Sequence, residues 1–135
     1  MDDNCIFCKL ANHVFDTNII FEDDDFTVIL DANPATKGHA LILPKEHYAN
    51  LYEMPDDLLA KAAVLTKKVV SRLTEKLETD GYNIVQNNGE TAGQTVFHFH
   101  IHLIPRYKDD GQRIGWKPMK PSAEELTALA DEIKI

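Results

Sequence analysis

The chain has 135 residues, of which 44% are hydrophobic and 27% charged, a composition typical of one globular domain spanning residues 1–135. The formal net charge of −8 argues against nucleic acid and anionic membranes as partners, because both attract clustered Lys and Arg. No apolar run approaches the roughly 20 residues of a membrane span, and the acidic start lacks the layout of a signal peptide, so we expect a cytoplasmic protein.

The two cysteines, Cys5 and Cys8, are separated by two residues near the start of the chain. In a reducing compartment this spacing is more typical of a metal half-site or a redox pair than of a structural disulfide. A redox pair normally follows a strand at the start of a helix. No strand is predicted before Cys5, so the sequence favours a metal half-site.

The first predicted strands form a hairpin. Residues 18–21 and 26–31 are rich in β-branched and aromatic side chains, and the acidic turn 22–25 separates them. Residues 40–43 form a short apolar run that ends before a proline, and this run predicts a third strand.

A long amphipathic helix is predicted over residues 55–77, where apolar positions recur every three or four residues. Residues 82–86 and 96–104 have the composition of strands. A final helix is predicted over residues 122–133, which open with a Ser-x-x-Glu capping box. The elements together indicate an α+β domain: about five largely antiparallel strands, one long helix on a face of the sheet, and short terminal helices.

Three histidines alternate with apolar residues in the strongest predicted strand. Successive side chains of a strand point to opposite faces, so His98, His100 and His102 are predicted to share one face, about 7 Å from one to the next. The opposite face would anchor the strand on the core through its apolar side chains, which are Phe97, Phe99, Ile101 and Leu103.

This row of histidines predicts nucleophilic chemistry at phosphorus. Imidazole is neutral near pH 7, so the central His100 can attack phosphorus and form a covalent intermediate. Its neighbours can orient it and donate hydrogen bonds to the phosphoryl oxygens and the leaving group. The pattern alone leaves open a three-histidine metal site and a merely solvated strand face.

The polar segment 87–95 directly precedes the histidines and ends in Gly93, Gln94 and Thr95. Glycine lets the backbone approach a ligand closely, and successive N–H groups with the Thr95 hydroxyl can donate to phosphate oxygens. Beside the histidines, this loop predicts an anion pocket next to a nucleophile.

The run HFHIHLI, residues 98–104, resembles the signature of the histidine triad family. The resemblance extends over nearly the whole chain through CIFCKL, LDANPATKGHALILPKEH and GYNIVQNNGETAGQTVFHFHIHLIPR, and it is weakest in the tail from about residue 108. These motifs are similar to those of the Hint-type branch in its bacterial form. The resemblance implies a homodimer with one sheet continuous across both protomers, and a purine nucleoside phosphoramidase or nucleotidyl hydrolase with a covalent nucleotidyl-histidine intermediate.

The same resemblance assigns roles to individual residues. His100 corresponds to the nucleophile, and His98, His102 and His39 correspond to the supporting histidines. The positions that correspond to nucleotide contacts, with Asp31 on the ribose hydroxyls, are Ile6, Phe7, Leu10, Leu30, Asp31, Asn87, Gly93, Gln94 and Thr95. The positions that correspond to the ligands of a structural zinc are Cys5, Cys8, His47 and His98, and no organic cofactor is expected.

Two other functions are compatible with the same motifs. The dinucleoside polyphosphate hydrolases of the family generally lack the Cys-x-x-Cys start, so the cysteines of this chain count against that branch. A purine-nucleotide-binding module with vestigial catalysis is disfavoured by the complete triad. The leaving group stays undetermined, because Arg106 stands where eukaryotic relatives have glycine.

Overall fold

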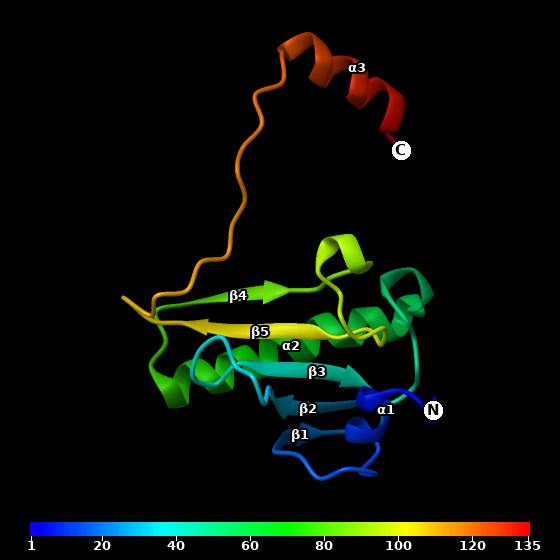
Figure 1. Ribbon diagram of the computed structural model, residues 1–135, viewed down its shortest axis with the longest axis vertical. Helices are drawn as coiled ribbons and strands as arrows, with labels where there is room; N and C mark the ends of the chain where they lie inside the picture. The colour runs from blue at the N-terminus through cyan, green and yellow to red at the C-terminus, as the bar shows by residue number, and fades with distance from the viewer.

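The computed structural model describes residues 1–135 and has one five-stranded sheet in the order β1-β2-β3-β5-β4 (Figure 1). The strands are β1 (Ile19–Glu22), β2 (Phe26–Leu30), β3 (Ala40–Pro44), β4 (Gly81–Val85) and β5 (Ile101–Arg106). The helices are α1 (Ile6–Ala11), α2 (Asp56–Leu77) and α3 (Ala123–Ile133), with single 3₁₀ turns at Leu51–Glu53 and Glu90–Ala92. Every strand pair is antiparallel, which confirms the predicted α+β class.

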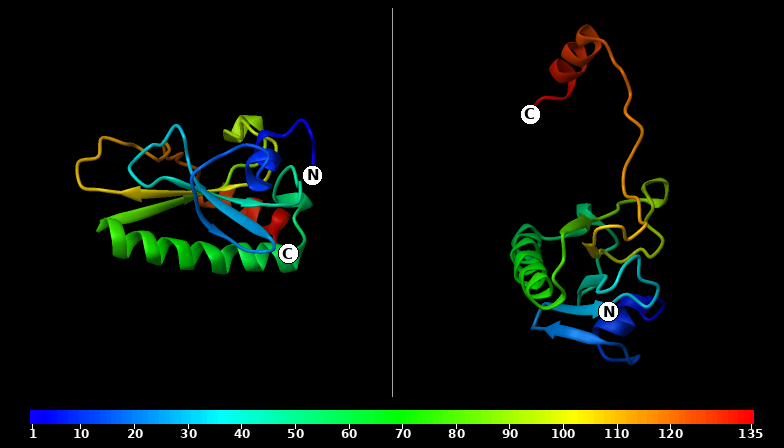
Figure 2. Two further views of the ribbon diagram at one scale, coloured as in Figure 1. Left: turned by 90° about the horizontal axis from the view of Figure 1, so that it is seen from below. Right: turned by 90° about the vertical axis from the view of Figure 1, so that its left-hand side faces the viewer.

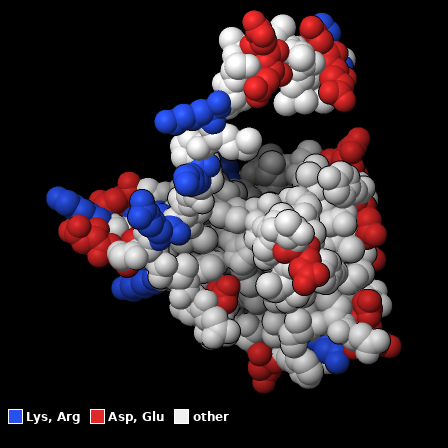
Figure 3. Space-filling view, turned by 45° about the horizontal axis from the view of Figure 1, so that its top comes forward, with Lys and Arg blue, Asp and Glu red and all other residues white.

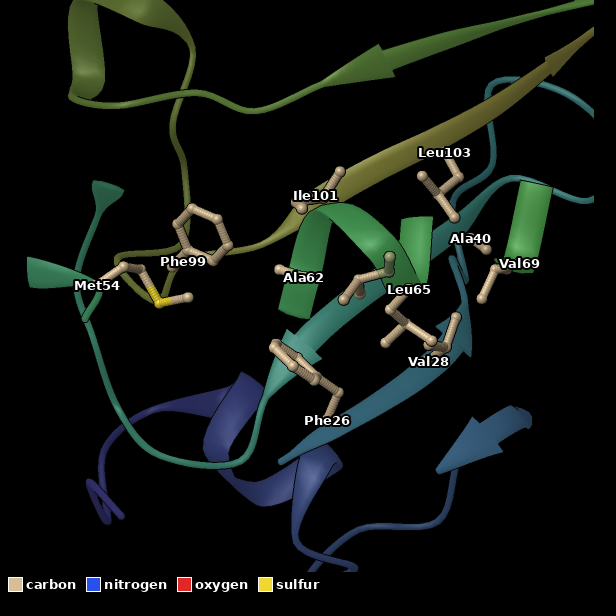
Figure 4. Close-up of a cluster of buried hydrophobic side chains, with 11 residues drawn as sticks. Phe26, Val28, Ala40, Met54, Ala62, Leu65, Val69, Phe99, Ile101 and Leu103 are labelled. Atoms are coloured by element: carbon tan, nitrogen blue, oxygen red, sulfur yellow. The ribbon is translucent and has the colours of Figure 1, made fainter. Parts of the chain in front are cut away.

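The main core lies between the sheet and α2, which runs along one face of the sheet (Figures 1 and 2). The apolar stripe of α2 faces the sheet through Ala62, Leu65 and Val69, as its periodicity predicts (Figure 4). The strands contribute the buried side chains Phe26, Val28, Ala40, Ile42, Ile101 and Leu103.

A smaller core lies on the opposite face of the sheet, under α1. It consists of the buried Ala11, Ile29, Leu41 and Leu43, against which Phe7 and Leu10 pack. Leu41 is the register partner of His102, and side chains of paired residues in neighbouring strands share a face. The face covered by α1 therefore also carries His102.

The strand predicted at residues 96–104 is shifted, and this prediction was wrong at its N-terminal half. Only residues from Ile101 onward are in β5, and Phe97, expected on the core, is 52% exposed. The reason is a contact with a loop: the Phe99 N–H donates to the Tyr48 carbonyl (2.6 Å) and not to a neighbouring strand. His98 and His100 therefore lie on an irregular segment that precedes the strand.

At its other end, β5 continues through Pro105 to Arg106, although a proline cannot donate to a sheet. Pairing with β3 ends at Leu103, and the Pro105 carbonyl accepts from the Thr36 hydroxyl (2.5 Å). The carbonyl and the nitrogen of one strand residue point to the same side, so the missing N–H faces a loop and no strand loses a hydrogen bond.

The C-terminal helix α3 begins as predicted, with the Ser122 hydroxyl accepting from the Glu125 N–H (3.1 Å). Residues 107–112 stay hydrogen-bonded to the body, and an extended arm of residues 113–122 carries this helix past the β4 edge and away from the sheet (Figure 1). No helix of the chain combines the length and the apolar character that crossing a membrane would require.

Candidate active site

Two of the histidines flank β3. His39 directly precedes this strand, and His47 lies three residues beyond its end. Two groups of side chains bring possible ligand atoms within 4.8 Å of one another. One is Asp31, His39 and His102, and the other is Cys5, Cys8, His47 and His98.

The register of the sheet assembles the first group. Leu30 pairs with Ala40, so Asp31 at the end of β2 lies beside His39 at the start of β3. Ala40 pairs in turn with Leu103, which brings His102 to the same place. Strand pairing alone therefore collects three side chains that are distant in sequence.

Hydrogen bonds determine the tautomers in this group. The Ala35 N–H donates to Nδ1 of His39 (2.9 Å), so a neutral His39 carries its proton on Nε2. That nitrogen lies 3.0 Å from Nδ1 of His102 and 3.5 Å from Oδ2 of Asp31. The Nδ1 of His102 therefore accepts, and the proton of His102 is on Nε2.

This tautomer assignment favours a hydrogen-bonded relay over a metal site at Asp31, His39 and His102. A metal on Nε2 of His39 would require the imidazole proton to move to Nδ1, where the Ala35 N–H already points. The relay instead presents the Nε2–H of His102 as a donor.

His100 has the opposite arrangement. Its Nδ1–H donates to the main-chain carbonyl of His98 (2.7 Å), so Nε2 carries a free lone pair. The ring stands edge-to-face against Phe7, with ring centroids 4.8 Å apart, and 4.9 Å from the ring of His102. Aromatic packing on one side and a hydrogen bond on the other hold the imidazole in one orientation.

Burial keeps these histidines neutral. It lowers the pKa of His100 and of His39 below the usual histidine value. The pKa of His102 is lowered to about 4, first by burial and then by repulsion from the neighbouring His100 and His39. At neutral pH, His100 is therefore an uncharged imidazole with an unprotonated Nε2, as a nucleophile must be.

The second group has the tautomers of a metal site. His98 donates from Nε2 to the Pro44 carbonyl (2.8 Å), which leaves the lone pair of Nδ1 pointing at the cysteines. This nitrogen lies 3.4 Å from Sγ of Cys5 and 3.4 Å from Sγ of Cys8. Nδ1 of His47 lies 3.3 Å from Sγ of Cys8.

These distances fit a tetrahedral ion. With Zn–S near 2.3 Å and Zn–N near 2.05 Å, the ligand sulfur and nitrogen atoms are about 3.6 Å apart. Groups around the four ligands also suit a metal site, because they orient the ligand side chains. Nε2 of His47 faces the Asp2 carboxylate at 3.9 Å, and the Asp2 N–H donates to Sγ of Cys8 (3.4 Å).

The loop before the histidines is shaped by Gln94, which is buried. Its side-chain nitrogen donates to the carbonyls of Ala49 and Val96, and its oxygen accepts from the Gly89 N–H. Gln94 therefore supports the loop, while the exposed Thr95 keeps its hydroxyl free of protein partners. Gly93 has a φ of 97°, and a Cβ there would contact the Asn87 amide (3.5 Å).

Three of the other residues assigned to nucleotide contacts are on α1: Phe7 and Leu10 pack on the smaller core, whereas Ile6 is exposed. Leu30 is also exposed, but as the register partner of Ala40 it belongs to the opposite face of the sheet. Phe7 therefore contacts His100, and Asp31 lies beside His39. Residues 93–95 directly precede the segment that carries His98.

Backbone groups were missed by the sequence analysis. The Ala35 N–H, the Pro44 carbonyl and the Tyr48 carbonyl set the tautomer of His39, the orientation of His98 and the break before β5. Main-chain groups have no residue-type signal. Only the motif surrounding Ala35 and Pro44, between Asp31 and His47, could have indicated that this segment holds the site.

Known proteins resemble this chain over nearly its full length. The HIT domain matches residues 12–109. A HIT-like protein of Methanocaldococcus jannaschii is 47% identical over 96% of this chain and 98% of its own. An adenosine 5′-monophosphoramidase of Schizosaccharomyces pombe is 39% identical over 96% of each chain.

Solved structures with a similar fold are also members of the HIT family. The crystal structure of a HIT family member from Bacillus subtilis has a TM-score of 0.90 at 37% identity, over 96% of this chain and 94% of that one. A Zn-bound histidine triad family protein from Mycobacterium smegmatis has a TM-score of 0.78 at 33% identity, over 96% and 98% of the two chains.

Proposed function

This chain belongs to the HIT family, and we propose that it hydrolyses purine nucleoside phosphoramidates through a covalent nucleotidyl intermediate on His100. The observation that carries the proposal is the free Nε2 lone pair of a buried, neutral His100. The monophosphoramidases among its relatives support the substrate class.

In the first step, Nε2 of His100 attacks phosphorus, and the P–N bond to the leaving amine breaks as the new P–N bond forms. The leaving amine takes its proton from solvent water, while the Nε2–H of His102, whose Nδ1 accepts from His39, donates a hydrogen bond that orients the leaving group. The His98 carbonyl accepts the Nδ1–H of His100 and stabilises the positive charge that develops on its ring.

In the second step, water attacks the nucleotidyl phosphorus and His100 leaves. The attacking water releases a proton to solvent, which balances the proton taken up in the first step, and His102 and His39 keep their tautomers throughout. We assign the phosphoryl oxygens to the exposed Thr95 hydroxyl, because the N–H groups of Gly93 and Gln94, which the sequence offered for this role, already donate within the loop to the carbonyls of Glu90 and Gly89. The products are a nucleoside monophosphate and an amine.

A comparison of substrates tests the proposed activity. Adenosine 5′-phosphoramidate is expected to be cleaved with a kcat/KM at least about 100-fold above that for diadenosine tetraphosphate. Both are assayed with the same preparation by chromatography of the released AMP. A preference for the tetraphosphate would place the chain among dinucleoside polyphosphate hydrolases, and binding of AMP without turnover of either substrate would make it a binding module.

We assign the ribose to Asp31, which is half-buried with its Oδ1 accepting from the Asn33 N–H. A carboxylate can accept from both ribose hydroxyls, and such charge-assisted bonds are stronger than neutral ones. Asp31→Ala is therefore expected to weaken AMP binding by at least about tenfold, and 2′-deoxy-AMP binding by much less. Calorimetric titration measures both, with Asp16→Ala as a control at an exposed acid. Equal losses for the two sugars would contradict the assignment.

We also propose that Cys5, Cys8, His47 and His98 bind a structural zinc ion. The donor set, the tautomer of His98 and the Zn-bound relative support this. The ion would supply a crosslink between the N-terminal segment and the sheet. Because Phe7 lies between the two cysteines and against His100, this crosslink would also hold the packing around the nucleophile.

Finally, we propose a homodimer formed through β4. This strand is an edge of the sheet, and its Ile84 is 54% exposed. Pairing with the β4 of a second copy would satisfy the open edge and cover Ile84.

A further inference from the structure

The C-terminal helix α3 presents an apolar stripe that nothing in the chain covers. Leu126, Leu129, Ala130 and Ile133 recur at the spacing of one helix face, and all are exposed. Figure 3 shows this helix apart from the body, with acidic and uncharged side chains on its surface. The helix has 11 residues, and isolated helices shorter than about 12–15 residues are marginal in water. Its stability therefore calls for a surface that accepts the stripe.

An acidic row accompanies this stripe. At 100° per residue, Glu125 and Glu132 lie on the same side of the apolar face, next to Leu129. Seven residues separate the two carboxylates, which places them about 10.5 Å apart along the helix axis. A matching surface should be apolar along its floor and basic along one rim.

One groove of the body has this character. It lies between α2 and β1, has a volume of about 450 Å³, and has an apolar floor that includes Ile20, Phe21 and Leu73. Its basic side chains are Lys68, Arg72 and Lys76, one turn apart on α2. The first and last of them are about 12 Å apart along the helix axis, close to the spacing of the acidic row. Lys68 already lies over the Phe21 ring, at 4.5 Å from its centroid.

We propose that α3 of one copy docks in the α2–β1 groove of a second copy, with Glu125 and Glu132 facing its basic rim. The proposal rests on the homodimer proposed above. Apolar burial provides the attraction, and the opposite charges set the orientation of the helix, which is how charged rims act at interfaces. The chain has a net charge of −8, so a row of three cationic side chains is a local exception that can attract an acidic helix.

The path of the arm points to a second copy and away from the chain's own groove. Figure 1 shows α3 beyond the β4 edge, whereas β1 forms the opposite edge of the sheet. In a sheet continued across β4, the β1 of the second copy is six strand spacings from β5, about 29 Å. Residues 107–112 are held on the body by hydrogen bonds of Tyr107 and Gln112, and the free residues 113–122 can span up to about 33 Å, so the arm is long enough to reach it.

A charge exchange between chains tests this docking. The groove variant carries Lys68→Glu with Arg72→Glu, and the helix variant carries Glu125→Lys with Glu132→Lys. Each variant alone opposes like charges in a homodimer. A heterodimer of the two restores opposite charges at both of its contacts, since each helix then meets a groove of the other sign.

The readout is hydrogen exchange at the amides of residues 126–133, measured on the full chain. In the wild-type dimer we expect protection at least about tenfold above that of a peptide of residues 122–135. Each variant alone is expected to lose this protection. Heterodimers, co-expressed and purified through two tags that bind no metal, are expected to regain it. The control variant Lys37→Glu with Lys67→Glu has the same charge change outside the groove and should stay protected.

Several results would overturn the proposal. The first is a dimer in which the amides of α3 exchange as fast as in the peptide. The second is protection of α3 that stays unchanged in the charge-reversed variants. The third is a monomer at micromolar concentration in sedimentation. Rescue in a single chain that carries all four substitutions, without rescue in the heterodimer, would place α3 in its own groove. None of these measurements uses turnover, so an inactive protein with the expected exchange pattern would contradict the proposed activity and leave the docking intact.

Discussion

His100→Ala is expected to lower phosphoramidate turnover by at least about 10⁴-fold while AMP still binds. The reason is that no other side chain offers a free imidazole lone pair in this place, since His98 points its Nδ1 at the cysteines and His102 accepts from His39. Steady-state kinetics measure the loss, and titration with AMP measures the binding. In wild type, rapid quench with labelled substrate should trap the nucleotide on His100.

The control for this substitution is His13→Ala, which removes an exposed histidine that only contacts Glu22 (2.6 Å). This variant should keep wild-type turnover. Near-normal activity of His100→Ala would show that the reaction does not pass through His100, and it would remove the basis of the proposed mechanism.

The double substitution Cys5→Ser with Cys8→Ser should abolish zinc binding and lower the melting temperature by about 10 °C or more. A tetrahedral site loses half of its ligands, and the contact between the N-terminal segment and His98 loses its crosslink. Turnover should fall by less than about tenfold, because the Nδ1–H of His100 is held by a main-chain carbonyl and not by the ion.

Elemental analysis of protein purified without an affinity tag should give close to one zinc per wild-type chain and none in the double variant. Calorimetry measures the melting temperatures, and Asn4→Ser is the control for a neighbouring polar change. A double variant that keeps its zinc would place the metal on the triad histidines themselves. The nucleophile assignment would then have to be revised, because a coordinated imidazole has no free lone pair.

The sequence by itself determined the type and order of the elements. The three- and four-residue spacing of apolar positions gave α2 within one residue of its observed start, and the capping box gave the start of α3. These signals are local, because periodicity and caps depend on residues within a turn or two. The candidate residues were also local: the alternating histidines, the Cys-x-x-Cys pair and the glycine-containing loop are each visible within ten residues.

What the tertiary structure decided is how these residues divide into two sites. The alternating pattern predicted three histidines on one strand face with His100 as the nucleophile, and only the resemblance assigned His98 to a zinc site. In the fold, a hydrogen bond from Phe99 to Tyr48 interrupts the strand, so His98 turns to the cysteines and His102 joins His39. The chemical difference among the three rings then comes from the Ala35 N–H, the Pro44 carbonyl and the His98 carbonyl. Every residue type carries these main-chain groups, so only the packing of distant segments determines which imidazole nitrogen keeps its lone pair.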